Sequence, residues 1–227
     1  SGTRIGGIAA SIIGATFNEV HNHGNVANNH PIGGGAAGLS GNADSVTFTR
    51  VSSTGDISNR TGQFNALGDP MSFSDVAGLI GYVGQTNQVS ISDCFSTGLL
   101  TGGPDEYDIG GLIADLYDLQ SAAVIAVHNC YAANTFSGGR IGAGAAFGNI
   151  NIRSGESPSI TFTNIYWNTA TGSGDHITGF NGDTAFSAPT QIIALSPAQM
   201  QDASSFVGFD FTNIWWPPVG NAYPLLR

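Results

Sequence analysis

The chain has 227 residues, and only 10% of them are charged, well below the roughly 25% that is usual in globular domains. Its net charge is −10, and its six basic residues are all arginines scattered along the sequence, so we expect no nucleic-acid partner. It contains no run of 18 apolar residues, and we therefore expect no membrane insertion.

Five 11-residue stretches of the chain, at residues 16–26, 47–57, 90–100, 126–136 and 161–171, align with one another without gaps and predict its fold. In this repeat, the first apolar column contains Phe17, Phe48, Ile91, Val127 and Phe162. Three residues later, a second apolar column contains Val20, Val51, Cys94, Cys130 and Ile165. Members of the first column lie 31, 43, 36 and 35 residues apart, which leaves room for two or three short strands per period. The pattern predicts an all-β protein in which residues 1–172 form a parallel β-solenoid (β-helix) of about five coils.

Glycine-rich positions accompany each predicted coil. Apolar–glycine signatures precede the strands at residues 5–9, 32–36, 76–81, 109–114 and 141–145. A third column, four residues after the second, contains Gly24, Gly55, Gly98, Asn134 and Thr169. Because glycine and, less readily, asparagine adopt positive φ, this column predicts a left-handed turn residue in the first four coils.

The signature at residues 5–9 is already in repeat register near the start of the sequence. An uncovered coil end exposes unpaired backbone groups and an apolar cross-section. We therefore expect the first coil to stack on further coils of a longer protein or on the end of another subunit, which is self-association.

Three insertions interrupt the period, at residues 62–75, 102–108 and 153–159. Loops on a rigid scaffold carry much of the binding surface of a protein. The candidate contact residues are therefore Phe64, Asp69, Asp105 and Tyr107, with a cell-surface glycan or protein as the expected partner.

Acidic residues are densest in and after the second insertion, where Asp105, Glu106 and Asp108 are followed by Asp115 and Asp118. Carboxylate oxygens suit Ca²⁺, which makes Asp105, Glu106 and Asp108 candidate ligands, although the sequence contains no EF-hand or RTX pattern. The sequence therefore favours a solvated acidic loop without any cofactor, and Ca²⁺ binding is the alternative interpretation.

The sequence offers little for catalysis. Solenoid enzymes that act on polysaccharides use paired carboxylates, or a basic residue near Ca²⁺. In the alignment no acids recur at one rung of neighbouring coils, and the chain has no lysine. His21 and His23 follow Glu19 at the spacing of one strand face, yet the sequence shows no third and fourth metal ligand, which favours an exposed turn. We therefore expect a protein that is not an enzyme.

Cys94 and Cys130 share the second apolar column, and two interpretations fit them. Free cysteines pack well as small apolar groups in a core. Alternatively, they form a disulfide between neighbouring coils, because parallel strands about 4.8 Å apart fall within the Cα separation that a disulfide tolerates. The sequence leaves both open.

After residue 172 the repeat stops, and residues 173–227 are predicted to form a C-terminal cap packed on the last coil. Ser196 as N-cap and Pro197 as first helical residue predict a short helix that ends at about Ser204. Several aromatic residues follow, namely Phe206, Phe209, Phe211, Trp215, Trp216 and Tyr223. A cap should bury the two tryptophans, whereas a sugar-binding platform would leave at least one ring face open.

These stretches together resemble the GLUG repeats of large bacterial and archaeal surface proteins, which are adhesin- and haemagglutinin-like. The resemblance lies in VAGLIG at residues 76–81, IGGLIA at 109–114 and CFSTG at 94–98, and in residues 164–168, 196–200, 209–211 and 223–225. It implies a secreted, extracellular or cell-surface setting, and it brings no catalytic residues. We therefore expect a non-enzymatic structural or adhesive module, either part of a surface adhesin or a subunit of an extracellular fibre. A carbohydrate-binding or carbohydrate-degrading β-helix is the alternative.

Overall fold

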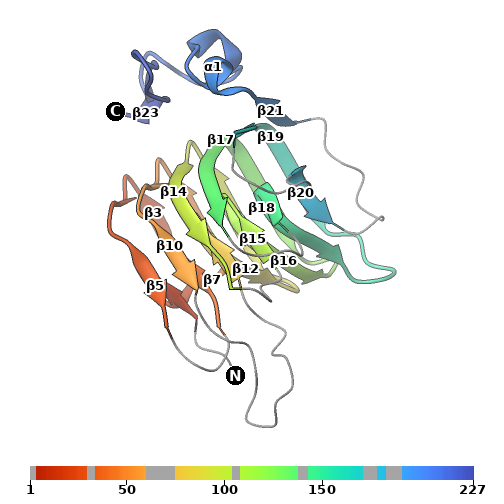
Figure 1. Ribbon diagram of the computed structural model, residues 1–227. Helices are drawn as coiled ribbons and strands as arrows, with labels where there is room; N and C mark the ends of the chain where they lie inside the picture. The colour runs from red at the N-terminus through yellow and green to blue at the C-terminus, as the bar shows by residue number, and fades with distance from the viewer. Residues whose placement is uncertain are drawn as a thin grey trace.

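The computed structural model describes residues 4–29, 34–59, 75–103, 108–137, 143–170, 178–182 and 191–227. Over these ranges the chain winds as a parallel β-solenoid whose coils stack side by side, with the C-terminal segment along one side of the stack (Figure 1). The candidate loop residues Phe64, Asp69, Asp105, Glu106 and Tyr107 lie outside the described residues.

Each coil contributes strands to two large parallel sheets. The first sheet contains β1 (Ile5–Gly6), β2 (Ile12–Ile13), β6 (Ala36–Ala37), β7 (Ser40–Asp44), β11 (Asp75–Ala77), β12 (Ile80–Gly84), β15 (Asp108–Gly110), β16 (Ile113–Leu119), β18 (Ala143–Ile152) and β20 (Thr178–Gly182). The second contains β3 (Thr16–Asn18), β4 (His21–Asn22), β5 (Val26–Asn28), β8 (Val46–Thr49), β9 (Ser52–Ser53), β10 (Ile57–Asn59), β13 (Gln88–Ser92), β14 (Phe95–Thr101), β17 (Val124–Ser137), β19 (Ser159–Asn168) and β21 (Ile192–Leu195). A short antiparallel pair, β22 (Trp215–Trp216) with β23 (Leu225–Leu226), follows near the C-terminus.

The predicted repeat alignment is the observed strand register. The five residues of the first apolar column pair successively across β3, β8, β13, β17 and β19. About four turns of the solenoid separate the first of these residues from the fifth. The predicted all-β parallel β-solenoid is therefore confirmed.

The core lies inside the coils and consists of the predicted inward columns. Phe48, Ile91 and Val127 are buried, and Val51 lies beside them. This is the expected arrangement for a solenoid, because each coil buries its inward side chains on the coils next to it.

Cys94 and Cys130 are both free and buried in this core. The backbone N–H of Cys94 points at the sulfur of Cys130 at 3.4 Å, so the two residues stack on neighbouring coils. Burial raises the pKa of the Cys130 thiol well above its ordinary value. The structure therefore shows two stacked thiols at this place in the second column.

Left-handed residues recur in every coil, but in a different column from the predicted one. They are Glu19, Arg50, Asp93, Asn129 and Asn164, whose φ angles lie between 51° and 58°. Of the predicted column only Gly98 has a positive φ, of 95°. Gly55 instead permits close stacking, since a Cβ there would lie 2.1 Å from the carbonyl oxygen of Gly24. The glycine column was thus misinterpreted for most coils: contact between coils, not turn geometry, explains Gly55.

The helical part of the C-terminus is shorter than predicted. Helix α1 spans Pro197–Met200, and the predicted capping by Ser196 is present as a capping box with Gln199. The helix ends early because Asp202 is extended and its side chain accepts the N–H of Ser204, starting a separate 3₁₀ turn at Ala203–Ser205. In the described part of the chain no helix is both long and apolar enough to cross a membrane.

The C-terminal extension, residues 191–227, packs along the side of the solenoid and not only on its last coil. Strand β21 does add to β19. The aromatic part, however, forms a second core with one outward aromatic residue from each of three coils: Phe95, Tyr131 and Tyr166. The hydroxyl of Tyr131 donates to the carbonyl oxygen of Pro224 at 2.6 Å. This placement differs from the predicted end cap, because the apolar surface that needed covering lies on the side of the stack.

The two tryptophans of the extension have different roles. Trp215 is fully buried between Phe95, Tyr131 and Phe209. Trp216 is 52% exposed, and the guanidinium of Arg227 lies 3.8 Å from the centre of its ring. Trp215 therefore fits the prediction for a cap, whereas Trp216 keeps an exposed surface.

Candidate functional site

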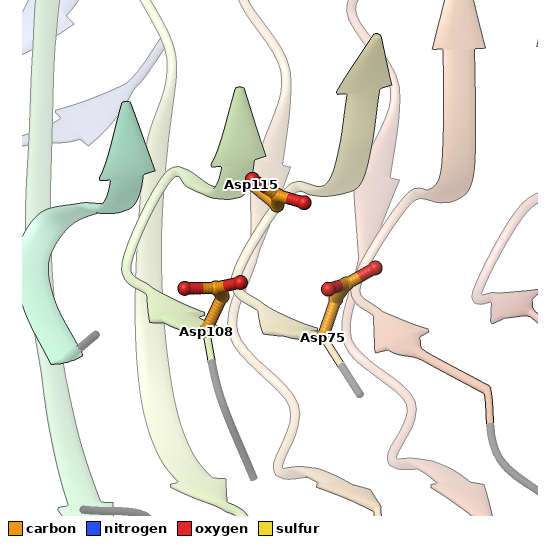
Figure 2. Close-up of side chains that lie close together, drawn as sticks. All are labelled: Asp75, Asp108 and Asp115. Atoms are coloured by element: carbon orange, nitrogen blue, oxygen red, sulfur yellow. The ribbon is translucent and has the colours of Figure 1, made fainter. Parts of the chain in front are cut away.

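Three carboxylates from two neighbouring coils meet in one place, which we call the carboxylate cluster. Its members are Asp75, Asp108 and Asp115, each of which offers an oxygen within 4.8 Å of the others. Figure 2 shows Asp75 and Asp108 side by side on adjacent strands, with Asp115 facing them from a third strand. Among the described residues, these three aspartates form the one group of at least three acidic, histidine or cysteine side chains that lie close enough together to hold a metal ion.

The parallel register brings these side chains together. Asp75 is the first residue of β11 and Asp108 the first residue of β15, and the two are direct partners in the ladder. Asp115 lies in β16, beyond the bend at Gly111 that separates β15 from β16. Because the two strands meet at an angle there, the side chain of Asp115 points back at the other two (Figure 2).

Several neighbours hold the cluster in place. Arg4 donates from Nε and Nη2 to Asp75 Oδ2, both at 3.4 Å, and its guanidinium lies 4.2 Å from the ring centre of Tyr82. Asn149 donates from Nδ2 to Asp115 Oδ1 at 3.1 Å. Gly35 occupies the same rung as Asp75, and a Cβ there would lie 3.1 Å from the Asp75 backbone. One arginine thus faces three carboxylates.

Burial makes it costly to ionise all three groups. Desolvation raises the pKa of Asp75 to about 6, of Asp108 to about 8 and of Asp115 to about 9. The charge of Asp75 adds to the rise at Asp108 and Asp115, while the charge of Arg4 opposes it at Asp75. Burial, followed by the charge of Asp115, also raises the pKa of Tyr82.

The negative charge of the three carboxylates can be neutralised in two ways. The cluster can keep protons at neutral pH, since two of its three pKa values lie above 7. It can instead hold a hard divalent cation such as Ca²⁺, because carboxylate oxygens are the ligands that Ca²⁺ takes. General acid–base chemistry also needs carboxyl groups with separated pKa values. Asp75 and Asp115, however, are only 1% and 2% exposed, so they present almost no surface to a substrate.

The sequence interpretation found this cluster only in part. Asp108 was a candidate Ca²⁺ ligand, whereas its predicted companions Asp105 and Glu106 lie outside the described residues. The expectation that no acids recur at one rung of neighbouring coils was wrong, because Asp75 and Asp108 pair. The missed signal is an aspartate immediately before the apolar–glycine signature in two consecutive coils.

The structure does not bring the two candidate histidines to this cluster. His21 and His23 belong to the first coil, whereas the carboxylates come from the third and fourth. Both histidine side chains are exposed, as the sequence interpretation expected, but His21 lies in strand β4 and not in a turn.

Comparison of the chain with protein-family models, with curated proteins and with solved structures found no match.

Proposed function

We propose that this chain is a non-enzymatic structural or adhesive module of an extracellular surface protein, and that its first coil docks onto another solenoid coil. In a solution of this chain alone, that coil must come from a second copy. The observation that carries the docking is an inward column that is fully buried in the second to fourth coils and partly exposed in the first.

This column contains Ile8, Leu39, Leu79 and Leu112. Each N–H of the first three residues donates to the carbonyl oxygen of the next, at 3.0 to 3.1 Å, so the four stand in register. Leu39, Leu79 and Leu112 are completely buried, whereas Ile8 is 38% exposed. The first coil therefore leaves apolar core surface open, and covering it with another coil is favourable by the hydrophobic effect.

The backbone of the first coil supports the same proposal. Strands β1, β3 and β5 each pair with the second coil on one side, and on the other side they have no partner strand among the described residues. Unpaired strand edges are templates for adding another strand. Polar backbone edges and an open apolar interior together favour docking of a coil of the same shape.

The extracellular setting comes from the resemblance to GLUG repeats in the coils and near the C-terminus. The apolar–glycine signatures of neighbouring coils pair with one another in register, which is compatible with such a repeat. A role as part of an adhesin or as a fibre subunit fits a rigid stack with few charges. Binding of Ca²⁺ at the carboxylate cluster stays a prediction and is tested separately below.

Light scattering after size exclusion, across a range of concentrations, tests the docking. Ile8→Lys places a charge in the open column, and Val219→Lys places the same charge at a position of the C-terminal extension that is 77% exposed. We expect the unchanged chain and Val219→Lys to gain mass with concentration, and Ile8→Lys to stay monomeric. A monomer at every concentration, or an Ile8→Lys variant that assembles normally, contradicts the proposal.

A carbohydrate-degrading solenoid is the second candidate. Burial of Asp75 and Asp115 leaves almost no surface for a substrate, so a single feature favours this candidate, the chemistry of the carboxylate cluster. Its carboxyl groups have the separated pKa values that glycoside hydrolysis uses. Asp115→Asn would then abolish release of reducing ends from a polysaccharide panel. Absence of such release from the unchanged chain removes this candidate and leaves the structural proposal intact.

A further inference from the structure

Two exposed histidines stand on one face of the first coil. His21 lies in β4 and His23 follows one residue after its end, so the two are at positions i and i+2 of an extended segment. Their rings are nearly parallel, with centroids 6.2 Å apart and 21° between the planes. This is the spacing at which two imidazoles of one strand can turn toward a common ion.

Each ring is oriented by a hydroxyl group of the second coil. His21 Nδ1 lies 2.9 Å from Ser52 Oγ, and His23 Nδ1 lies 2.8 Å from Thr54 Oγ1. When Nδ1 carries the proton and donates it to the hydroxyl oxygen, the lone pair is on Nε2. Metal-binding histidines are held in the same way, by a hydrogen bond from the ring nitrogen that does not bind the metal.

Asn22, the residue between the two histidines, fixes the backbone, and its side chain is not directed at the proposed ion. Asn22 donates from Nδ2 to the carbonyl oxygens of Gly38 at 2.9 Å and Gly24 at 3.1 Å. The N–H of Thr54 donates to the carbonyl oxygen of Asn22 at 2.9 Å. The segment is thus tied to the second coil through its side chain and its backbone, which holds the two rings side by side.

We infer that His21 and His23 form a two-histidine surface site for a transition-metal ion of the Zn²⁺ class. Neutral imidazole suits Zn²⁺, Cu²⁺ and Ni²⁺, whereas Ca²⁺ and Mg²⁺ prefer oxygen ligands. Within the described residues, no third histidine, cysteine or acidic side chain joins this pair in a metal-binding group. The remaining coordination positions are therefore open to water or to a group supplied by a bound partner.

Calorimetric titration of the full chain with Zn²⁺ tests the inference. We expect one bound ion that is lost in the double variant His21→Gln/His23→Gln and kept in His128→Gln, which removes a half-buried histidine of β17. His30 and His176 lie outside the described residues, and they remain unchanged in all these variants. Because the two substituted side chains are exposed, the circular dichroism of the double variant should match that of the unchanged chain.

A second variant tests the orienting hydroxyls. Ser52→Ala keeps both histidines but removes the partner of His21 Nδ1, and it should weaken Zn²⁺ binding by roughly 10-fold. Unchanged affinity in this variant overturns the positioning role of Ser52. Absence of Zn²⁺ binding by the unchanged chain, or full binding by the double histidine variant, overturns the site itself.

Discussion

Asp75, Asp108 and Asp115 lie close together in a place where burial opposes their ionisation. The pKa of each is raised, which means that the folded chain binds more protons than the unfolded chain over the pH range between the ordinary and the raised values. Arg4 opposes the rise at Asp75, to which it donates a hydrogen bond, and its charge also opposes the rise at Asp115. We therefore expect the stability of the fold to respond to protons at this cluster, and to cations if the cluster binds them.

The first prediction is a loss of stability as pH rises. The protonated cluster contributes its full stability below the ordinary aspartate pKa, and this contribution disappears as pH passes the raised values of about 6, about 8 and about 9. Asp108→Asn should stabilise the fold by on the order of 1–3 kcal/mol at pH 9, because it removes one repelling charge. Urea unfolding at pH 5 and pH 9 measures both effects.

Two comparisons make this prediction specific. Asp44→Asn changes an acid that belongs to a different part of the first sheet, and it should leave the pH dependence unchanged. Ca²⁺ should raise the melting temperature of the unchanged chain at pH 9, and should do so less in Asp108→Asn. Stability that is flat or rising between pH 5 and pH 9 contradicts the role given to the cluster.

At the scale of strands, the register between neighbouring coils explains which features could be predicted from the sequence. The first apolar column was predictable because inward residues recur at every coil and need no knowledge of the turns between them. The pairing of Asp75 with Asp108 was missed because the aligned signatures began one residue later, at Val76 and Ile109. Asp115 joins them only across the bend at Gly111, and a strand pattern does not specify the angle of a bend.

The sequence also contains a signal for the position of the C-terminal extension. Phe95, Tyr131 and Tyr166 each follow directly after a residue of the second column, so their side chains face outward. A row of outward-facing aromatic residues on neighbouring strands would form an exposed apolar patch, and it therefore indicates that another element covers it. That element is the extension, which buries all three.

The two adjacent tryptophans provide a matched test of this packing. Trp215→Ala should destabilise the fold by about 3–5 kcal/mol, because its ring is completely buried among aromatic neighbours. Trp216→Ala should cost about 1 kcal/mol or less, since its ring is half exposed and its contact is the stacked Arg227. Equal losses in chemical unfolding would show that the extension does not pack on the solenoid through Trp215.

At the scale of the whole molecule, the solenoid is covered along one side and open at its first coil. The extension covers the row of outward-facing aromatic residues of the third to fifth coils. The first coil keeps a partly exposed Ile8 in a column that is otherwise buried, together with strand edges that have no partner strand in the described part of the chain. This difference between the covered side and the open coil is the physical basis for the docking that we propose.

Hydrogen exchange of residues 5–28, measured at low and high protein concentration, tests this docking most directly. We predict that amides of the first coil exchange more slowly at high concentration, because pairing with another coil protects its strand edges. The amides of β23, in the C-terminal extension, should exchange at the same rate at both concentrations. Exchange in the first coil that does not depend on concentration would contradict the account.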